Sequence, residues 1–391
     1  MPGRALVPGA LAFGARCLSS TRPTTEGDFL IAFIVGTTAE LIKIAPVFHE
    51  IRATGADPHI WFTAQHTAEV PDTLADLGLP APHRWLASPT DVGLEAPGQV
   101  PGWAWGIARR TVRNRAEMRE ELSANGRPAL VVVHGDTFTT LYGSIIGRLL
   151  GARVAHVEAG TRSGSLLSPL PEEANRRLAA RLVDLHFAPT EREVHNLRRS
   201  SGVVVNTEAN TVIDAIRLAM ERQAEPSEGE RVGLITLHRF ELLQRPEKFT
   251  EILTALRRRA DDLPLVYLAG GPERERIGQL GLGHLFDDRF RLRPKARYLE
   301  FLPMLARAEL VVTDSGGLQE ECAYLGVPCA IYRERTERHQ GLGENIVLTG
   351  MQVSALGAFL DNYESHRRPS ALEQFHPSRK IAETLGALGY C

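Results

Sequence analysis

The sequence predicts an α/β protein built from two Rossmann-like domains. The clearest evidence is the segment Val131–Arg177, in which a β-branched run, Val131–Val133, precedes an apolar helix pattern and a second apolar run, Val154–Val157. A strand–helix–strand unit of this length forms a parallel crossover. Strands and helices alternate along the rest of the chain, and the series starts again near Val203. Two such series in tandem predict two halves that face each other across a cleft.

The first half begins with a candidate central strand, the apolar run Phe29–Val35. The glycine that follows, Gly36, should let a ligand approach the backbone and the N-terminus of the helix that starts near Glu40. This turn lacks the GxGxxG pattern of dinucleotide-binding proteins. Leu79–Val100 is rich in proline and glycine and is expected to form a long loop. The other strands and helices predicted in this half are His59–Phe62, Trp105–Leu122, Leu185–Ala188 and Glu191–Arg199.

The second half repeats the alternation of strands and helices. The new series starts at the predicted strand Val203–Val205, at the boundary between the halves, and the strands predicted after it are Val232–Thr236, Leu265–Leu268, Leu310–Thr313 and Cys329–Tyr332. Its predicted helices are Thr211–Met220, Pro246–Arg258 and Leu318–Leu325. A last helix, Ala371–Leu388, is expected to return to the first half. The predicted domains are therefore residues 29–205 and 206–366, and residues 367–391 form the returning helix.

The composition excludes several classes of function. The 391 residues are too many for one ordinary core and enough for two. With 45 basic and 47 acidic residues, the chain has no basic field for nucleic acid. Its hydrophobic content of 43% is ordinary for a soluble protein, and no apolar run approaches the length that spans a bilayer. We therefore expect neither nucleic acid nor a membrane as a partner.

The cysteines and the N-terminus bear on the compartment. Cys17, Cys322, Cys329 and Cys391 show neither CxxC spacing nor a histidine pattern, so no metal site is predicted and a reducing compartment, the cytoplasm, fits. Residues 1–28 contain arginines but no acid before Glu26, which faintly resembles an organellar transit peptide. The simpler prediction is a disordered extension outside the fold.

Acidic side chains follow two neighbouring strands of the predicted sheet. Asp136 comes just after the first strand of the crossover, Glu158 directly after the second, and Arg162 and Glu172 lie on the following loop. Because the carboxyl ends of parallel strands face the ligand crevice, these side chains should lie at one crevice. Asp136 alone fits a helix N-cap equally well. Three carboxylates and an arginine together favour acid/base chemistry.

A second set of candidate residues lies in the second half. Asp314-Ser315-Gly316-Gly317 separates a strand from a helix, where open backbone N–H groups and the helix dipole would hold a pyrophosphate without lysine or metal. An ordinary tight turn with an N-cap serine explains this pattern equally well when it is taken alone. Glu321, one turn into the helix, could reach the hydroxyls of a ribose. His238-Arg239 ends another strand and would face the same cleft.

These motifs together resemble those of the UDP-N-acetylglucosamine 2-epimerase family, which has a glycosyltransferase-B-type (GT-B) fold. The resemblance covers about Phe29 to Gly350, nearly the whole predicted fold. Seven ordered motifs are far more specific than any one of them. They are HGDTFTT, HVEAGTRSG, SPLPEEANRR, HFAPT, ANTVIDAI, TLHRFE and DSGGLQEE.

The resemblance implies an isomerase that interconverts UDP-GlcNAc and UDP-ManNAc. UDP leaves by elimination across C1 and C2, and an enzyme-bound 2-acetamidoglucal takes it back with C2 inverted. The family needs no cofactor, binds a nucleotide-sugar as its small-molecule substrate, and forms homodimers. The catalytic residues that it implies are Asp136, Glu158, Glu172 and His238. The implied UDP- and substrate-binding residues are Lys43, Arg162, Arg239, Phe301, Ser315, Gly316, Gly317, Glu321 and Arg338.

The sequence also departs from the family pattern. The first turn usually carries an arginine for the diphosphate, and here the residue is Thr38, with Lys43 as a partial substitute. The strand end that usually contains a histidine reads AGGP, residues 269–272. That histidine belongs to a regulatory UDP-GlcNAc site in bacterial members, so Gln65 and His66 are interpreted as vestiges of it. The final TERPE-like motif becomes TERHQ, residues 336–340.

Three alternatives to this function stay open. In a hydrolysing epimerase, water captures the glycal and releases ManNAc and UDP. A GT-B-type glycosyltransferase would need an acceptor, for which no motif is visible, and would not need three carboxylates near C2. A nucleotide-sugar-binding protein without catalysis would fit if Thr38 removes too much stabilisation of the diphosphate.

Overall fold

The structure is a computed structural model of the chain. It describes residues 31–65, 70–87, 94, 97–122, 129–162, 172–222 and 231–391. The predicted N-terminal extension, His66 and the side chain of Glu172 lie outside the described part. Within that part, every helix is too short or too polar to cross a membrane.

The first half contains a parallel sheet of seven strands in the order β3-β2-β1-β4-β5-β6-β7. All of its neighbouring strands pair in parallel, and the order reverses direction between β1 and β4. This reversal is the topological switch point, where ligands bind in open α/β sheets. The strands are β1 (Ile31–Val35), β2 (His59–Phe62), β3 (Arg84–Trp85), β4 (Leu130–His134), β5 (Arg153–Val157), β6 (Leu185–Ala188) and β7 (Val203–Asn206).

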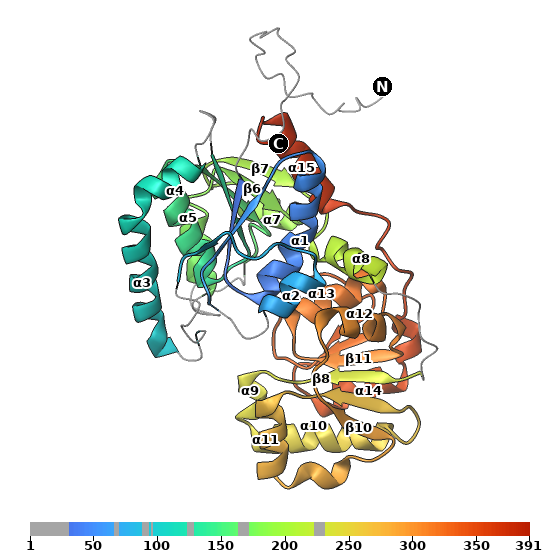
Figure 1. Ribbon diagram of the computed structural model, residues 1–391. Helices are drawn as coiled ribbons and strands as arrows, with labels where there is room; N and C mark the ends of the chain where they lie inside the picture. The colour runs from blue at the N-terminus through green and yellow to red at the C-terminus, as the bar shows by residue number, and fades with distance from the viewer. Residues whose placement is uncertain are drawn as a thin grey trace, which may run out of the picture.

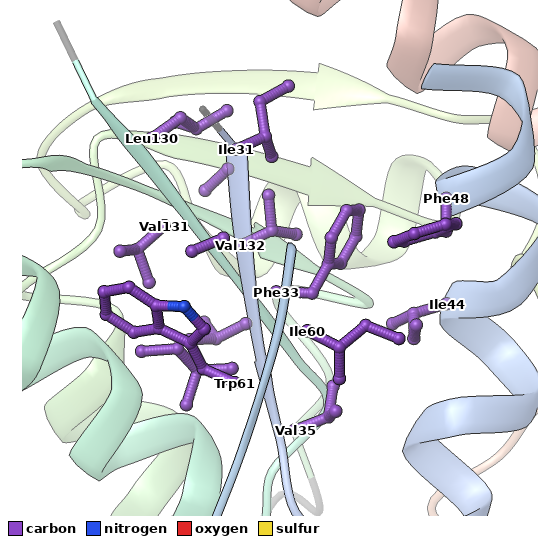
Figure 2. Close-up of a cluster of buried hydrophobic side chains, with 14 of the residues drawn as sticks. Ile31, Phe33, Val35, Ile44, Phe48, Ile60, Trp61, Leu130, Val131 and Val132 are labelled. Atoms are coloured by element: carbon purple, nitrogen blue, oxygen red, sulfur yellow. The ribbon is translucent and has the colours of Figure 1, made fainter. Parts of the chain in front are cut away.

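Helices cover both faces of this sheet, which explains why its central strands are apolar on both faces. Figure 2 shows Phe33 and Phe48 on the side of α1, whereas Trp61 and Val131 point to the opposite face. The segment predicted as one helix, residues 105–122, forms parts of two helices, α3 and α4, which are separated at Asn114. The helices of this half are α1 (Thr38–Ala53), α2 (Val70–Asp76), α3 (Val100–Arg113), α4 (Arg115–Leu122), α5 (Phe138–Leu150), α6 (Glu172–Ala179) and α7 (Glu191–Asn196).

The second half repeats the plan with a parallel sheet of six strands, in the order β10-β9-β8-β11-β12-β13. Its switch point lies between β8 and β11. The strands are β8 (Gly233–Thr236), β9 (Leu265–Leu268), β10 (Phe290–Arg293), β11 (Leu310–Thr313), β12 (Cys329–Ile331) and β13 (Ile346–Leu348). The helices are α8 (Val212–Arg222), α9 (Phe240–Leu243), α10 (Pro246–Arg259), α11 (Gly271–Gln279), α12 (Tyr298–Arg307), α13 (Gly316–Leu325) and α14 (Val353–Asp361).

The last helix, α15 (Pro377–Ala387), packs against α1 of the first half (Figure 1). Ile381 and Leu385 are buried in the core of the first sheet. The helix starts at Pro377, later than predicted, because the fixed φ of proline suits the first helical position. Ser378 N donates to Asp214 Oδ2 at 2.7 Å, which fixes this start to α8. The domain boundaries themselves stay a prediction.

The prediction of an α/β fold with two Rossmann-like domains across a cleft is confirmed. The prediction that the second series starts with the strand at Val203–Val205 is wrong, because this strand is β7 and pairs with β6 in the first sheet. Strands β3, β10 and β13 were not among the predicted elements. β10 reads FRLR, and its arginines hide it from a search for apolar runs. β3 and β13 have only two and three residues.

The turn after β1 is closed to ligands. The N–H groups of Gly36 and Thr37 both donate to Glu40 Oε2, at 2.8 and 3.0 Å. A Cβ at Gly36 would overlap the hydroxyls of Thr63 and Thr139, which hydrogen-bond each other at 2.7 Å. The expectation that Gly36 lets a ligand approach the backbone is therefore wrong, because this glycine is needed for packing at the strand ends.

We predict that Gly36→Ala lowers the free energy of unfolding by about 1–3 kcal/mol, since the added methyl overpacks a buried site. Gly357→Ala is the matched control, because a Cβ at Gly357 in α14 meets nothing within 4 Å. It should raise the free energy of unfolding by about 0.5–1 kcal/mol through helix propensity. Chemical denaturation measures both, and equal effects of the two substitutions would contradict this role of Gly36.

Candidate active site

A cavity of about 310 Å³ opens where the carboxyl ends of the two sheets face each other. The first half contributes residues of α1 to its wall. The second half contributes Val212 of α8 and residues at or after the ends of β8, β9, β10 and β11. Ligand crevices lie at these strand ends in open α/β sheets. The lining residues are Ala39, Ile42, Lys43, Val212, Thr236, His238, Leu268, Lys295, Ala296, Tyr298, Phe301, Ser315, Gly317, Leu318 and Glu321.

The N-terminus of α13 forms one end of the cavity. Ser315 is its N-cap, and the serine hydroxyl accepts a hydrogen bond from Leu318 N at 3.4 Å. A Cβ at Gly317 would meet only Ser315 Oγ, at 3.9 Å, so the backbone lies open on that side. The helix dipole gives this end partial positive charge. The arrangement suits a phosphate group.

Asp314 fixes His238 beside that helix end. The buried Asp314 carboxylate accepts hydrogen bonds from the backbone N–H of His238 and of Arg239, at 3.0 and 2.8 Å. His238 Nδ1 lies 3.5 Å from the same carboxylate. Burial raises the pKa of Asp314, and the facing His238 opposes this rise. Asp314 therefore acts on the fold of the β8–α9 turn and on the orientation of His238.

Glu321 and Tyr298 lie on the wall between the two halves. Burial raises the pKa of Glu321 to about 7, although the nearby Lys43 lowers it. Burial and the adjacent Glu321 raise the pKa of Tyr298 well above its ordinary value. Phe301, one turn further along α12, presents an aromatic ring to the cavity. This wall offers a carboxylate for hydroxyl groups and a ring for a planar group.

Glu158 is bound by cations from both halves. Its Oε2 lies 2.6 Å from Lys43 Nζ, and its Oε1 lies 2.5 Å from Arg338 of the second half. His134 Nε2 is 3.3 Å away. Burial alone would raise the pKa of Glu158, but Arg338 and Lys43 outweigh it and hold the pKa well below the ordinary value. The Glu158 backbone has φ of 63°, which is strained for a residue with a side chain.

Glu320 completes this charged cluster. Its carboxylate is fully buried and lies 3.1 Å from Arg338 and 3.5 Å from Lys43. Asn210 Nδ2 donates to it at 3.3 Å. We call Lys43, Glu158, Glu320 and Arg338 the bridging cluster. Glu320 was not among the residues predicted from the sequence. Glu320 and Glu321 are adjacent on α13 and therefore point to different sides of the helix, so a second role for one of them could have been expected.

Asp136 is held by α6. Arg176 Nε donates to its carboxylate at 2.8 Å, and Asn175 Nδ2 donates to its backbone oxygen at 3.2 Å. Burial alone would lower the pKa of Arg338, but Glu158, Glu320 and Asp136 together raise it well above the ordinary value. The charge of Asp136 therefore acts on Arg338, which forms its ion pairs with Glu158 and Glu320. Arg176 was not predicted, although it lies one helical turn after Glu172 in the motif SPLPEEANRR.

Some predicted site residues of the first half lie away from the cavity. Arg162 donates to Thr161 O at 2.8 Å and lies 3.9 Å from Glu173. Gln65, which follows β2, accepts from Thr139 Oγ1 in the first turn of α5 at 3.0 Å. Both side chains therefore have protein partners in positions that do not line the cavity. Asp136 and Glu158 do not line it either, and the cavity reaches Glu158 only through its ion-pair partner Lys43.

Three predicted residues of the second half also lie off the cavity wall, namely Arg239, Gly316 and Arg338, and the last of these belongs to the bridging cluster. Arg239 lines a separate hollow of about 200 Å³. Gly316 begins α13, and a Cβ there would lie 3.5 Å from the side chains of Arg338 and Glu337. Within the described ranges, no group of three or more acidic, histidine or cysteine side chains could hold a metal ion.

Comparison with known proteins finds relatives that match most of the chain. The UDP-N-acetylglucosamine 2-epimerase from Escherichia coli (strain K12) is 34% identical over 336 residues, which cover 79% of this chain and 83% of the relative. The same enzyme from Methanocaldococcus jannaschii is 32% identical over 343 residues, which cover 81% of this chain and 88% of the relative. The solved UDP-GlcNAc 2-epimerase from Neisseria meningitidis, bound to UDP-GlcNAc, has a TM-score of 0.73 and 28% identity, and the match covers 92% of this chain and all of that one.

The family model for UDP-N-acetylglucosamine 2-epimerase matches residues 50–381. This range includes both sheets from β2 onward, the carboxylates that follow β4 and β5, and the N-terminus of α13. The chain therefore belongs to the UDP-N-acetylglucosamine 2-epimerase family.

Proposed function

We propose that this protein is a UDP-N-acetylglucosamine 2-epimerase that interconverts UDP-GlcNAc and UDP-ManNAc. One observation carries the proposal. One cavity is lined by the anion-binding helix end of the second half and by Lys43 of the first half, and Lys43 forms an ion pair with the buried carboxylate of Glu158. This is the arrangement that a nucleotide-sugar needs when its diphosphate departs from a sugar whose C2 proton is removed. Relatives that carry this name match 81% and 79% of the chain.

In this proposal the nucleotide binds to the second half. The diphosphate lies at the N-terminus of α13, with Ser315 and Gly317 on one side and His238 on the other. The ribose hydroxyls donate to Glu321, and the uracil ring packs on Phe301. This placement directs the sugar toward the first half, where Glu158 and Asp136 lie.

The chemistry follows from that placement. A carboxylate of the first half takes the C2 proton, the electron pair forms the C1–C2 double bond, and the C1–O bond breaks to release UDP. The reverse steps add UDP at C1 and a proton at the opposite face of C2. Asp136, Glu158 and Glu172 are the proposed acid/base groups. The helix dipole and His238 stabilise the negative charge that develops on the departing diphosphate.

A hydrolysing epimerase is the second candidate. In it, water instead of UDP attacks C1 of the glycal, and the products are ManNAc and UDP. The AGGP strand end, residues 269–272, and Thr38 at the first turn favour it, since both depart from the pattern of the non-hydrolysing members. The two candidates share every step before the attack on C1.

We expect deuterium at C2 of the sugar after incubation of UDP-GlcNAc with the enzyme in heavy water. The proposed reaction exchanges the C2 proton with solvent through a carboxylate, so mass spectrometry should find labelled UDP-GlcNAc and UDP-ManNAc. Free UDP should stay far below the amount of product. Release of one UDP for each labelled ManNAc would instead establish the hydrolysing reaction. Turnover without any label would contradict both, and would favour a glycosyltransferase.

We expect Asp136→Asn and Glu158→Gln to lower kcat by about 10²–10⁴-fold, the usual range for a lost acid/base group. Affinity for UDP should change by less than about threefold, because these groups act on the sugar. Ser315→Ala and Glu321→Ala should give the opposite pattern. Isothermal titration and steady-state rates separate the two patterns, and thermal melting controls for loss of the fold in Glu158→Gln, which breaks a buried ion pair.

We expect the affinity for UDP to fall as pH drops below about 7. Burial raises the pKa of Glu321 to about 7 in the free protein, and only the ionised carboxylate accepts hydrogen bonds from both ribose hydroxyls. Lowering the pH from about 8 to about 6 therefore protonates the group that binding requires. Glu321→Gln is the control, since the UDP phosphate also titrates near pH 6. An equal pH dependence in both proteins would show that Glu321 does not contact the ribose.

A further inference from the structure

Lys295 lies on the cavity wall, and none of the proposed roles involves it. It follows β10, and its side chain is 52% exposed. It lines both the main cavity and an adjoining hollow of about 280 Å³ between α2 and α12. Thr38 lines the same adjoining hollow from the first half. It stands at the turn where the family pattern usually has an arginine. Lys295 is therefore a cation that faces the ligand space from the second half.

A buried carboxylate holds this lysine. Glu273, in the first turn of α11, is 1% exposed, and its Oε1 lies 2.9 Å from Lys295 Nζ. Its Oε2 is buried and has no hydrogen-bond partner in the described part of the chain. A Cβ at Gly270 would lie 3.0 Å from Glu273 Oε2 and 3.2 Å from Lys295 Nζ. The ion pair of Glu273 and Lys295 thus lies directly over the end of β9. A residue larger than glycine at position 270 would restrict the space that this pair occupies.

The position along the sheet indicates which part of a nucleotide Lys295 can reach. The order β10-β9-β8-β11 places the end of β9 two strand spacings, roughly 10 Å, from the end of β11 where α13 begins. A diphosphate at α13 and a ribose at Glu321 leave this remote end of the cavity for the base. Leu268, Ala296 and Phe301 line that end and give it the apolar surface that a flat ring needs.

We propose that Lys295 determines the specificity for the nucleobase, by donating a hydrogen bond from its ammonium group to a carbonyl oxygen on the uracil edge, and that Glu273 is its positioning residue. This inference rests on the proposed function, because it assumes a uridine nucleotide in the cavity. Lysine has three donors and no acceptor. It therefore matches the O4 carbonyl of uracil and opposes the N4 amino group of cytosine, which is itself a donor.

The test compares the affinities for UDP and for CDP, measured by isothermal titration. Lys295→Met should weaken the binding of UDP about tenfold and leave that of CDP nearly unchanged, so the preference for UDP over CDP falls about tenfold. Lys295→Arg keeps the donors and should retain most of the preference. Lys248→Met is the matched control, because Lys248 is 43% exposed, pairs with Glu251 at 3.1 Å and lines none of the three cavities described. It should change neither affinity.

Further variants separate positioning from folding. Glu273→Gln should lower the preference for UDP in the same direction, and should add nothing to Lys295→Met in the double variant. The double variant also removes both charges, which avoids leaving Glu273 buried without its partner. An unchanged preference in Lys295→Met, or an equal loss for UDP and CDP, would overturn the inference. A wild-type protein that binds no UDP would overturn the proposed function instead.

Discussion

The bridging cluster holds the two halves in register. Lys43 comes from α1, Glu158 from the end of β5, Glu320 from α13, and Arg338 from the loop that follows β12. None of the four side chains is more than 13% exposed, and two positive charges balance two negative ones. A buried ion pair adds little net stability, but removing one partner costs about 3–5 kcal/mol. Any relative placement of the halves that separates these charges would therefore be destabilised. The placement that keeps them paired is also the one that forms the cavity between the halves.

The same cluster connects ligand binding with the chemistry proposed for Glu158. Of the two cations that lower its pKa, Lys43 lines the cavity in which we propose that the substrate binds. A bound dianion would draw Lys43 toward itself and weaken its ion pair with Glu158. Burial, which is the largest influence on the pKa of Glu158, would then raise that pKa. In this view, substrate binding itself converts Glu158 from an ion-pair partner into a stronger base.

Much of the site was predictable because it depends on where strands end. Asp136, Glu158, His238 and Ser315 follow strands that apolar runs reveal, and parallel strands bring their carboxyl ends to one edge. The order of the strands in each sheet decides which strand ends are neighbours. This order depends on tertiary packing and could not be predicted from the sequence. The prediction for Gly36 failed for a related reason, since the threonine side chains that fill its surroundings, at positions 63 and 139, are distant in the chain.

Side-chain partners across the two halves could not be predicted from the sequence. Adjacent helix positions point about 100° apart, so α13 directs Glu321 to the cavity and Glu320 into the bridging cluster. Which of the two faces which way depends on the orientation of the whole helix.

The left-handed backbone of Glu158 shows what this arrangement requires. Residues with φ near +60° cost about 1–2 kcal/mol unless they are glycine, and a glycine here would have no carboxylate. Gly160, two residues later, has φ of 91°, and a Cβ there would lie 2.6 Å from Glu193 O, so the turn has no room to relax. The strain aims the carboxylate at Lys43 and Arg338 instead of along the strand. A less strained turn would release Glu158 from the bridging cluster, and the two halves would lose a carboxylate that both of them bind.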